Sequence, residues 1–254
     1  MKIKAISFNI RCDSDPNGHA ISERAPRLNS ATSKYDADVI GFQECVPEWV
    51  EYIEKYYGEK YEFFNRYRSD GEDKESTPIL WKKDKFELID KGCFWLSATP
   101  EVPSRGWDPD GFCNRICLYV VLKDKKTGEK FTFMNTHFGF GDTDQVNSAK
   151  LIYEYSKKIS DYPTFVTGDF NMEPDSAGYK TMTKNFTDVN AVTAKDMRTT
   201  FHDYRLEPSK VLHIDYCFTD EKITPVSQKM IEDTFDGKFP SDHYGLYVEL
   251  ETKK

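Results

Sequence analysis

The chain has 254 residues and a formal net charge of −8, with 35 Lys and Arg against 43 Asp and Glu. This acidic balance argues against a broad basic face that wraps duplex DNA, but it is compatible with a small phosphorylated substrate or a locally gripped nucleic acid. No stretch approaches the roughly 20 apolar residues of a membrane span. Residues 1–254 contain no repeat or Pro/Gly/Ser linker, so we expect a single domain.

Patterns typical of strands and of helices alternate along the chain. Ten segments have the composition of strands, and they span residues 2–9, 37–43, 61–66, 77–82, 86–95, 116–122, 131–137, 163–169, 213–219 and 244–250. Apolar residues recur at helical spacing in four segments, which are 23–35, the stretch after Pro47, 145–160 and 176–186. Because long strand runs in the middle third have no helices between them, we expect two mixed β-sheets packed together with helices outside.

Four of the predicted strands end on a polar side chain that can bind a ligand. "IKAISFN" ends on Asn9, "DVIGFQE" on Glu44, "FTFMNTH" on His137 and "TFVTGD" on Asp169. Asn171 follows Asp169 by two residues, so both side chains face the same way if the strand geometry continues. If these strands lie side by side, their ends meet along one edge of the sheets, where binding and catalytic residues usually lie.

A group of carboxylates at one edge of a sheet would be unstable without a cation. Two later stretches, "HIDYCF" and "SDHYGL", add Asp215, Asp242 and His243 to the polar strand ends, and Glu75 is a further acidic candidate. Two carboxylates about 5 Å apart repel by roughly 3 kcal/mol at an effective dielectric near 20. Oxygen ligands of this kind suit Mg²⁺, Mn²⁺ or Ca²⁺. A cation with histidine donors and a carboxylate base is suited to phosphate-ester hydrolysis.

The order of these motifs resembles a known enzyme superfamily. "SFNIR", "GFQE", "NTHF", "TGDFN", "HIDY" and "SDHYGL" follow one another between residues 7 and 246. This order is similar to that of the endonuclease/exonuclease/phosphatase superfamily, which includes pancreatic-type deoxyribonucleases, apurinic-site endonucleases and inositol-polyphosphate 5-phosphatases. "FWLSATPEVPSRGWD" followed by "NRICLYVVL" resembles a bacterial subgroup of largely unassigned substrate. The resemblance implies a four-layer α/β sandwich, in which helices flank two packed mixed β-sheets and the site lies at one end of them.

The resemblance also implies a role for each residue near the cation and the attacking water. Glu44 would be the principal Mg²⁺ ligand, helped by Asn9, and Asp242 would complete the metal environment. Asp169 would orient or deprotonate the attacking water. Asn171 would hold the phosphate.

Five further residues would surround the phosphate. His243, held by Asp215, would donate to a phosphoryl oxygen. His137 would be a second phosphate-facing histidine, and family members often pair it with a Glu that is matched here by Glu75 in "ESTPILW". Arg115 in "CNRICLY" falls where the subgroup carries an arginine, which could grip phosphate with two parallel hydrogen bonds.

Two positions depart from the pattern of the superfamily. Relatives commonly have N-T-H-[FL]-D with an arginine some residues later. Gly139 stands at the position of that Asp, and Gln145 stands near the expected arginine. Because Gly139 and Gly141 loosen the backbone, we expect residues 138–145 to form a mobile loop that shapes substrate preference.

The sequence therefore predicts a metal-dependent phosphoric ester hydrolase that acts on a phosphodiester or a phosphomonoester. A nuclease acting on DNA or RNA is the alternative. An inactive binding protein on the same scaffold and a calcium-binding module are remote alternatives, because the D-x-N and D-H motifs are both present. Six scattered cysteines and the lack of an apolar leader predict free thiols and a cytoplasmic location. No feature indicates an obligate protein partner.

Overall fold

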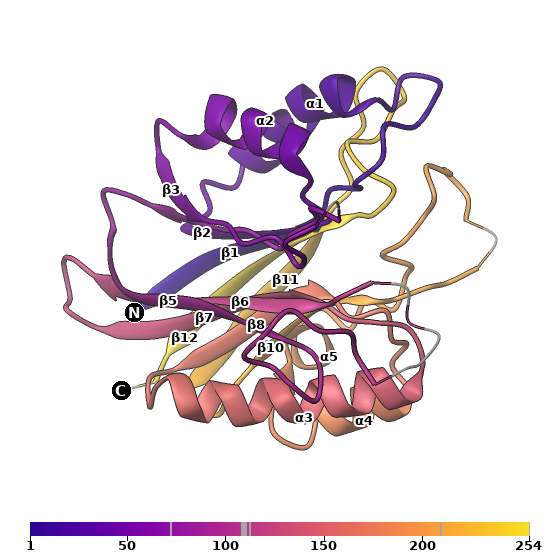
Figure 1. Cartoon of the computed structure of the whole chain (residues 1–254). Helices are drawn as coiled ribbons and strands as arrows, with labels where there is room; N and C mark the ends of the chain where they lie inside the picture. The colour runs from indigo at the N-terminus through magenta and orange to yellow at the C-terminus, as the bar shows by residue number, and fades with distance from the viewer. Residues whose placement is uncertain (72, 108–110, 112, 209, 254) are drawn as a thin grey trace.

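The structure is a computed structural model that describes residues 1–71, 73–107, 111, 113–208 and 210–253. In these residues, two six-stranded mixed sheets pack face to face, and helices cover their outer faces. Figure 1 shows the four layers, with α1 and α2 above the sheets and α3 and α4 below them. The predicted four-layer α/β sandwich is confirmed. No helix of the described residues is both long and apolar enough to cross a bilayer.

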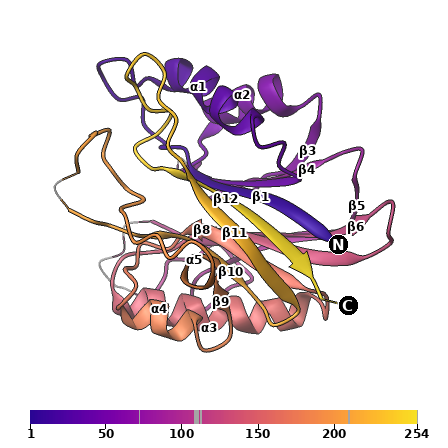
Figure 2. The same ribbon diagram turned by 180° about the vertical axis from the view of Figure 1, so that it is seen from behind.

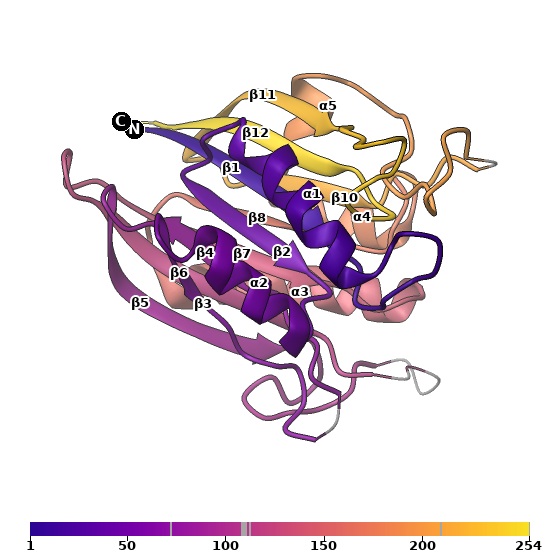
Figure 3. The same ribbon diagram turned by 90° about the horizontal axis from the view of Figure 1, so that it is seen from above.

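The first sheet has the strand order β11-β12-β1-β2-β4-β3. Its strands are β1 (Lys2–Asn9), β2 (Val39–Gln43), β3 (Tyr61–Phe64), β4 (Ile79–Lys82), β11 (Ile223–Ile231) and β12 (Gly245–Thr252). β1 and β2 run parallel, and the other neighbours run antiparallel. Figure 2 shows β11 and β12 beside β1. The start of β1 pairs with the end of β12, and both lie at the end of the molecule opposite the loop that follows β1 (Figure 3).

The second sheet has the strand order β5-β6-β7-β8-β10-β9. Its strands are β5 (Phe86–Trp95), β6 (Ile116–Asp124), β7 (Lys130–His137), β8 (Thr164–Asp169), β9 (Thr187–Asp188) and β10 (Asp215–Thr219). β7 and β8 are the parallel pair of this sheet. Each sheet therefore has a parallel pair whose carboxyl ends point to the same edge, and these are the strands whose ends carry the predicted site residues.

Three apolar clusters hold the layers together. Residues between the two sheets form one cluster, α1 and α2 pack on the first sheet in a second, and α3 and α4 pack on the second sheet in a third. The helices are α1 (Ile21–Ser33), α2 (Pro47–Tyr57), α3 (Asp142–Ile159), α4 (Ala177–Met182) and α5 (Val189–Val192). Pro47 opens α2 at a position where the missing amide hydrogen has no intrahelical acceptor.

The sequence patterns missed one long strand, β11. Its buried residues, Ile223, Gln228 and Ile231, are not spaced two apart, and Pro225 and a shift of register before Ser227 interrupt the strand. A strand with a proline is typical of a sheet edge, and β11 is an edge strand. The two-residue β9 was also not predicted, and several strands are a few residues shorter than their sequence patterns suggest.

Candidate active site

The ends of four strands bring the predicted site residues to one edge of the paired sheets. In the second sheet, Asp169 pairs with His137 on one side and with Asp215 on the other. Asn9 ends β1 in the first sheet, and its Nδ2 atom donates to Asp169 Oδ2 at 2.9 Å and to Glu44 Oε1 at 2.9 Å. Asn9 therefore joins the two sheets at the point where their polar strand ends meet.

Glu44 follows β2 directly and turns its carboxylate toward Asn9. Its backbone has a φ of 61°, which is unusual for a residue with a side chain. Its Oε2 atom accepts a hydrogen bond from Cys12 N at 2.9 Å. Burial opposes ionisation of Glu44, but nearby His137 and the hydrogen bonds from Asn9 and Cys12 outweigh burial and lower its pKa. Glu44 thus presents an ionised carboxylate that is held by two hydrogen-bond donors.

Asp169 lies between two histidines at the end of β8. Its Oδ2 atom is 3.6 Å from His137 Nε2 and 3.8 Å from His243 Nε2. Only 2% of Asp169 is exposed. Burial and the neighbouring Asp215 raise the pKa of Asp169, although the two histidines favour its charged form. A carboxylate in this setting is a better proton acceptor than one in water.

Asp215 holds His243 through Nδ1, the ring nitrogen on the side away from Asp169. The Nδ1 atom of His243 lies 2.9 Å from Asp215 Oδ2. Burial disfavours the charged imidazole, but the charge of Asp215 and its hydrogen bond outweigh burial and raise the pKa of His243 to about 10. His243 is therefore protonated at neutral pH, and its Nε2 hydrogen points toward the side of Asp169.

His137 and Asn171 form the other side of the site. Asn171 has a φ of 49° and a backbone amide that donates to Asp169 Oδ1 at 2.9 Å. Its Nδ2 atom donates to Phe138 O at 3.0 Å and lies 3.0 Å from His137 Nε2. The amide of Asn171 is thus held by the backbone of the neighbouring strand end. His137 Nδ1 lies 3.5 Å from Glu75 Oε1, so Glu75 faces the second nitrogen of this imidazole.

Two arginines flank Glu75 at this side of the site. Arg68 Nη1 donates to Glu75 Oε1 at 2.6 Å, and Arg115 Nη1 lies 3.8 Å from the same oxygen. Arg68 was not predicted as a site residue. Its position seven residues before Glu75 in a charged segment gave no indication that the two side chains meet.

Arg11 is a second cation that the sequence patterns did not assign. It lies two residues beyond β1, has a φ of 61°, and places Nε 3.1 Å from Asp15 and 3.7 Å from Asp242. Burial and the charge of Glu44 raise the pKa of Asp242, and Arg11 opposes this shift. Arg11 belongs to the quoted "SFNIR" motif, two residues after the predicted ligand Asn9. This position in a motif of the predicted site was the sequence signal that could have placed Arg11 near the acidic residues.

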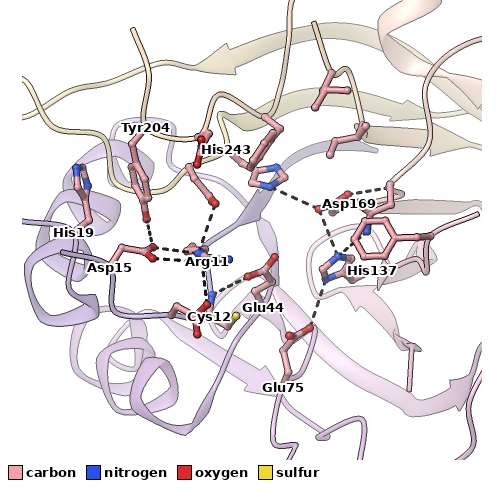
Figure 4. Close-up of a pocket in the computed structure, with 18 of the residues that line it drawn as sticks. Arg11, Cys12, Asp15, His19, Glu44, Glu75, His137, Asp169, Tyr204 and His243 are labelled. Carbon is pink, nitrogen blue, oxygen red and sulfur yellow. Dashed lines mark hydrogen bonds and ion pairs between the residues drawn. The ribbon is translucent and has the colours of Figure 1, made fainter. Parts of the chain in front are cut away.

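One cavity of about 770 Å³ joins these groups. All the predicted site residues line it except Asn9 and Asp215, which are buried behind Asp169 and His243. Figure 4 shows Asp15, His19 and Tyr204 at one end of this pocket and His137 with Glu75 at the other. The predicted site residues therefore converge on a shared cavity, although the role of each one stays a prediction.

Donor atoms in this cavity and directly behind it could hold a metal ion. Glu44, His137 and Asp169 each offer a ligand atom within 4.8 Å of the others, and Asp169, Asp215 and His243 form a second such group. Among the described residues, Asp242 belongs to neither group, although it lines the same cavity. Carboxylate oxygens dominate both groups, and such ligands favour hard divalent cations.

Comparison with known proteins identifies the family. The model of the endonuclease/exonuclease/phosphatase family matches residues 6–243. The chain belongs to this family. Its predicted class as a phosphoric ester hydrolase follows from this membership.

Three relatives illustrate the range of the family. The mannosyl-6-phosphatase of Bacteroides thetaiotaomicron has a similar structure, with a TM-score of 0.91, 29% identity, and coverage of 98% of this chain and 99% of that one. An uncharacterised protein of Acanthamoeba polyphaga mimivirus is 30% identical over 155 residues, which are 58% of each chain. The CCR4-Not complex 3'-5'-exoribonuclease subunit Ccr4 of Emericella nidulans is 23% identical over 250 residues, with 70% of this chain and 36% of that protein covered. The chain thus spans about half or less of these two curated relatives.

Gly139 and Gln145, the two residues that depart from the family pattern, lie beside the cavity. A Cβ atom at Gly139 would lie 2.7 Å from Asp144 Oδ2, so the missing side chain makes room for the carboxylate of Asp144. Gln145 is buried, and its Nε2 atom donates to Asn171 O at 2.6 Å. The prediction of a loop over 138–145 is wrong for 142–145, which form the first turn of α3. The helix begins three residues before the predicted segment 145–160, and Asp142 and Asp144 place negative charge at its N-terminus, which favours a helix start.

Proposed function

We propose that this family member hydrolyses phosphate esters in a reaction that requires a divalent cation, Mg²⁺ or Mn²⁺, with Ca²⁺ as a further candidate. The observation that carries the proposal is the group formed by the half-buried Glu44 and the buried Asp169 and His137, whose ligand atoms lie within 4.8 Å of one another. Such a group has the hard oxygen donors that these cations prefer.

The chain's own residues fit a cation at this point. Glu44 would be the principal ligand, Asn9 would assist it, and Asp242 would complete the environment. The pKa of Asp169 and the pKa of Asp242 are both raised by burial and by a neighbouring carboxylate, so both would gain from a positive charge among them. When bound, the cation would neutralise charge on the phosphoryl oxygens.

Asp169 and Asn171 would prepare the attack on phosphorus. Asp169 would orient a water molecule and accept its proton, because its raised pKa makes it a stronger base than an exposed aspartate. Asn171 would hold a phosphoryl oxygen with its side-chain amide. The hydrogen bond from Asn171 N to Asp169 Oδ1 fixes both side chains in one turn.

Two histidines would stabilise the charge that develops on the phosphoryl group. His243, kept protonated by Asp215, would donate its Nε2 hydrogen to a phosphoryl oxygen. His137, which faces the same carboxylate from the opposite side, would make the second contact. Arg115 would add a further positive charge, and Glu75 would orient His137.

A nuclease is the second candidate, supported by the similarity to the Ccr4 exoribonuclease subunit. The mannosyl-6-phosphatase, which is similar over nearly the whole chain, supports a small phosphorylated substrate instead. An inactive binding protein is disfavoured because the acid, both histidines and the D-x-N turn lie in one cavity.

A screen of phosphate esters tests the proposed function. p-Nitrophenyl phosphate, bis(p-nitrophenyl) phosphate, oligo(A) and plasmid DNA are incubated with the protein and Mg²⁺, Mn²⁺ or EDTA. We expect hydrolysis of at least one ester class that EDTA abolishes and that Asp169→Asn lowers by about 10² to 10⁴. Undiminished hydrolysis by purified Asp169→Asn, with no activity in a mock purification, would refute the assignment of Asp169.

A further inference from the structure

Arg115 is a buried cation that lines the cavity, and its guanidinium group is not fully hydrogen-bonded within the described chain. Only 6% of Arg115 is exposed, although it lines the cavity together with His137 and Asn171. Within the part of the chain that the structure describes, its buried Nη1 atom has no hydrogen-bond partner. The nearest acid, Glu75, lies 3.8 Å from Nη1, which is too far for a hydrogen bond.

Glu75 is already engaged by another arginine. Arg68 Nη1 donates to Glu75 Oε1 at 2.6 Å, and Arg68 Nε lies 2.9 Å from both oxygens of Asp73. The Arg68–Glu75 ion pair therefore forms a fixed part of the cavity wall. The Nη1 donor of Arg115 remains available to hydrogen-bond a ligand. Burying an arginine without its hydrogen bonds is costly, so an anion that accepts from Arg115 Nη1 would offset part of that cost.

Charged and polar groups lie around Asp169 in the cavity. His137 Nε2 and His243 Nε2 lie 3.6 Å and 3.8 Å from Asp169 Oδ2, and Arg115 lines the same cavity together with the proposed cation ligands Glu44 and Asp242. A terminal phosphate presents three free oxygens and up to two negative charges to these groups. A phosphodiester presents two free oxygens and one charge, and its second ester carbon would have to lie against polar side chains.

Arg115 belongs to a part of the cavity wall that is built of buried charged side chains. Arg68, Glu75 and Arg115 are all buried there, and the half-exposed ring of Phe140 lies 5.8 Å from the Arg115 guanidinium carbon. An ester carbon placed at this wall would leave Nη1 of Arg115 without a hydrogen-bond acceptor. A substrate whose alcohol extends toward the opposite end of the cavity would avoid this cost.

That opposite end carries acids and an aromatic ring rather than free cations. Asp15 and Tyr204 lie at that end (Figure 4), and Asp13 and Asp203 also line the cavity. Each of these acids is already paired with an arginine: Arg11 lies 2.9 Å from Asp13 and 3.1 Å from Asp15, and Arg205 lies 3.0 Å from Asp203. Phosphates that flank the scissile bond of a nucleic acid would meet these carboxylates. A neutral alcohol with hydroxyl groups would instead find hydrogen-bond acceptors.

We propose that the site selects phosphomonoesters of small, neutral, hydroxyl-bearing alcohols, and that Arg115 is the residue that distinguishes a terminal phosphate from a diester. This inference rests on the proposed function, because it concerns the ester class that the same site accepts. Arg115 contacts the substrate in this scheme, whereas Arg68 takes the hydrogen bond to Glu75 Oε1 and leaves Arg115 Nη1 3.8 Å from that oxygen.

Kinetic and binding measurements on the full chain test this inference. Values of kcat/KM for p-nitrophenyl phosphate and bis(p-nitrophenyl) phosphate are compared in the unchanged protein, in Arg115→Met and in Arg115→Lys. Binding of inorganic phosphate and of dimethyl phosphate is measured by calorimetry in the same proteins. Arg66→Met is the matched control, because Arg66 packs over Trp95 and, among the described residues, is not part of the cavity lining.

We expect the unchanged protein to prefer the monoester and to bind phosphate at least tenfold more tightly than dimethyl phosphate. Arg115→Met should lower monoester kcat/KM and phosphate affinity by about 10- to 100-fold, the range of a charge-assisted hydrogen bond, while the diester changes by less than about threefold. Arg115→Lys should lie between these values because it keeps the charge without the planar fork. Arg66→Met should match the unchanged protein.

The failure of this inference can be told apart from failure of the proposed function. Equal or better hydrolysis of the diester, or an equal loss of both activities in Arg115→Met, would overturn the monoester inference and leave the proposed function intact. If no ester of the screen described above is hydrolysed, the proposed function fails, and the binding arm decides the inference alone. Equal affinities for phosphate and dimethyl phosphate would then refute it, and a preference that disappears in Arg115→Met would support it.

Discussion

The Nδ1 atom of His243 lies 2.9 Å from Oδ2 of Asp215, and this contact keeps the imidazole charged in a buried site. We predict that His243→Ala lowers turnover by about 10² to 10⁴, the usual loss when a general acid is removed. Asp215→Asn should also lower turnover, because an amide cannot stabilise the imidazolium by charge. Initial rates on a responsive ester measure both effects, and circular dichroism checks that the fold is retained.

The two residues should act as a unit. The double variant of Asp215→Asn and His243→Ala should have nearly the turnover of His243→Ala alone, because Asp215 acts through the histidine that is absent. Rate losses that multiply in the double variant would show that Asp215 acts independently of His243. Full activity of His243→Ala on every responsive ester would remove this residue from the mechanism.

Glu44 is predicted to be the principal metal ligand. Glu44→Gln keeps the size of the side chain and its contact with Asn9, but removes the negative charge. We expect the affinity for Mg²⁺ or Mn²⁺ to fall by at least about tenfold, since even outer partners of a metal site contribute about this much. Isothermal calorimetry measures the change. Glu62→Gln, on an exposed position of β3, is the matched control, and an unchanged affinity in Glu44→Gln would exclude Glu44 as a ligand.

The strand ends were predictable because their chemistry is local. An apolar run that stops at Asn9 or at Asp169 identifies both a strand and the polar residue at its end, and the family order of motifs adds Asp215 and His243. The sequence does not give distances between these residues. It also could not show that Asn9 bridges Glu44 and Asp169, because this contact depends on how the two sheets pack.

Polar residues inside the predicted strands were not predictable in the same way. Asn135 and Gln43 lie between the sheets, where Gln43 Nε2 donates to Asn135 Oδ1 at 2.7 Å and Thr167 Oγ1 donates to the same oxygen at 3.0 Å. Gly41 makes this possible, because a Cβ atom there would lie 2.5 Å from Asn135 Oδ1. Such a network follows from contacts between strands far apart in the sequence, which no local pattern records.

Arg24 is predicted to hold the loop that leads from β1 into the site. Its guanidinium donates to the backbone oxygens of Ile10, Arg11, Asp13 and His19, and it is fully buried. Arg24→Met would leave these carbonyl groups without donors, so we expect the free energy of unfolding to fall by about 3 kcal/mol or more. Denaturant titration measures the loss.

Arg27→Met is the control for this variant. Arg27 lies on the same helix but donates to one backbone oxygen, that of Gly18. Its replacement should cost about 1 kcal/mol or less. Equal stability losses in the two variants would mean that the contacts of Arg24 do not hold the loop.

Asp188 is predicted to make stability depend on pH outside the active site. It is buried, accepts hydrogen bonds from Tyr179 Oη and Asn190 N at 2.9 Å each, and has a pKa raised by burial, although both hydrogen bonds oppose the shift. Because the unfolded chain loses this proton at a lower pH than the folded chain, the stability contribution of Asp188 falls as pH rises from about 4 through the folded pKa. Asp188→Asn carries no such charge, and Tyr179 can turn its hydroxyl to accept from the amide. The stability of Asp188→Asn relative to the unchanged protein should therefore increase over this pH range, by about 1.4 kcal/mol for each unit by which the pKa is raised.

Denaturant titrations at several pH values, with the exposed Asp161→Asn as control, measure the difference. A relative stability that stays constant between pH 4 and pH 7 would show that Asp188 ionises as easily in the folded chain as in the unfolded one.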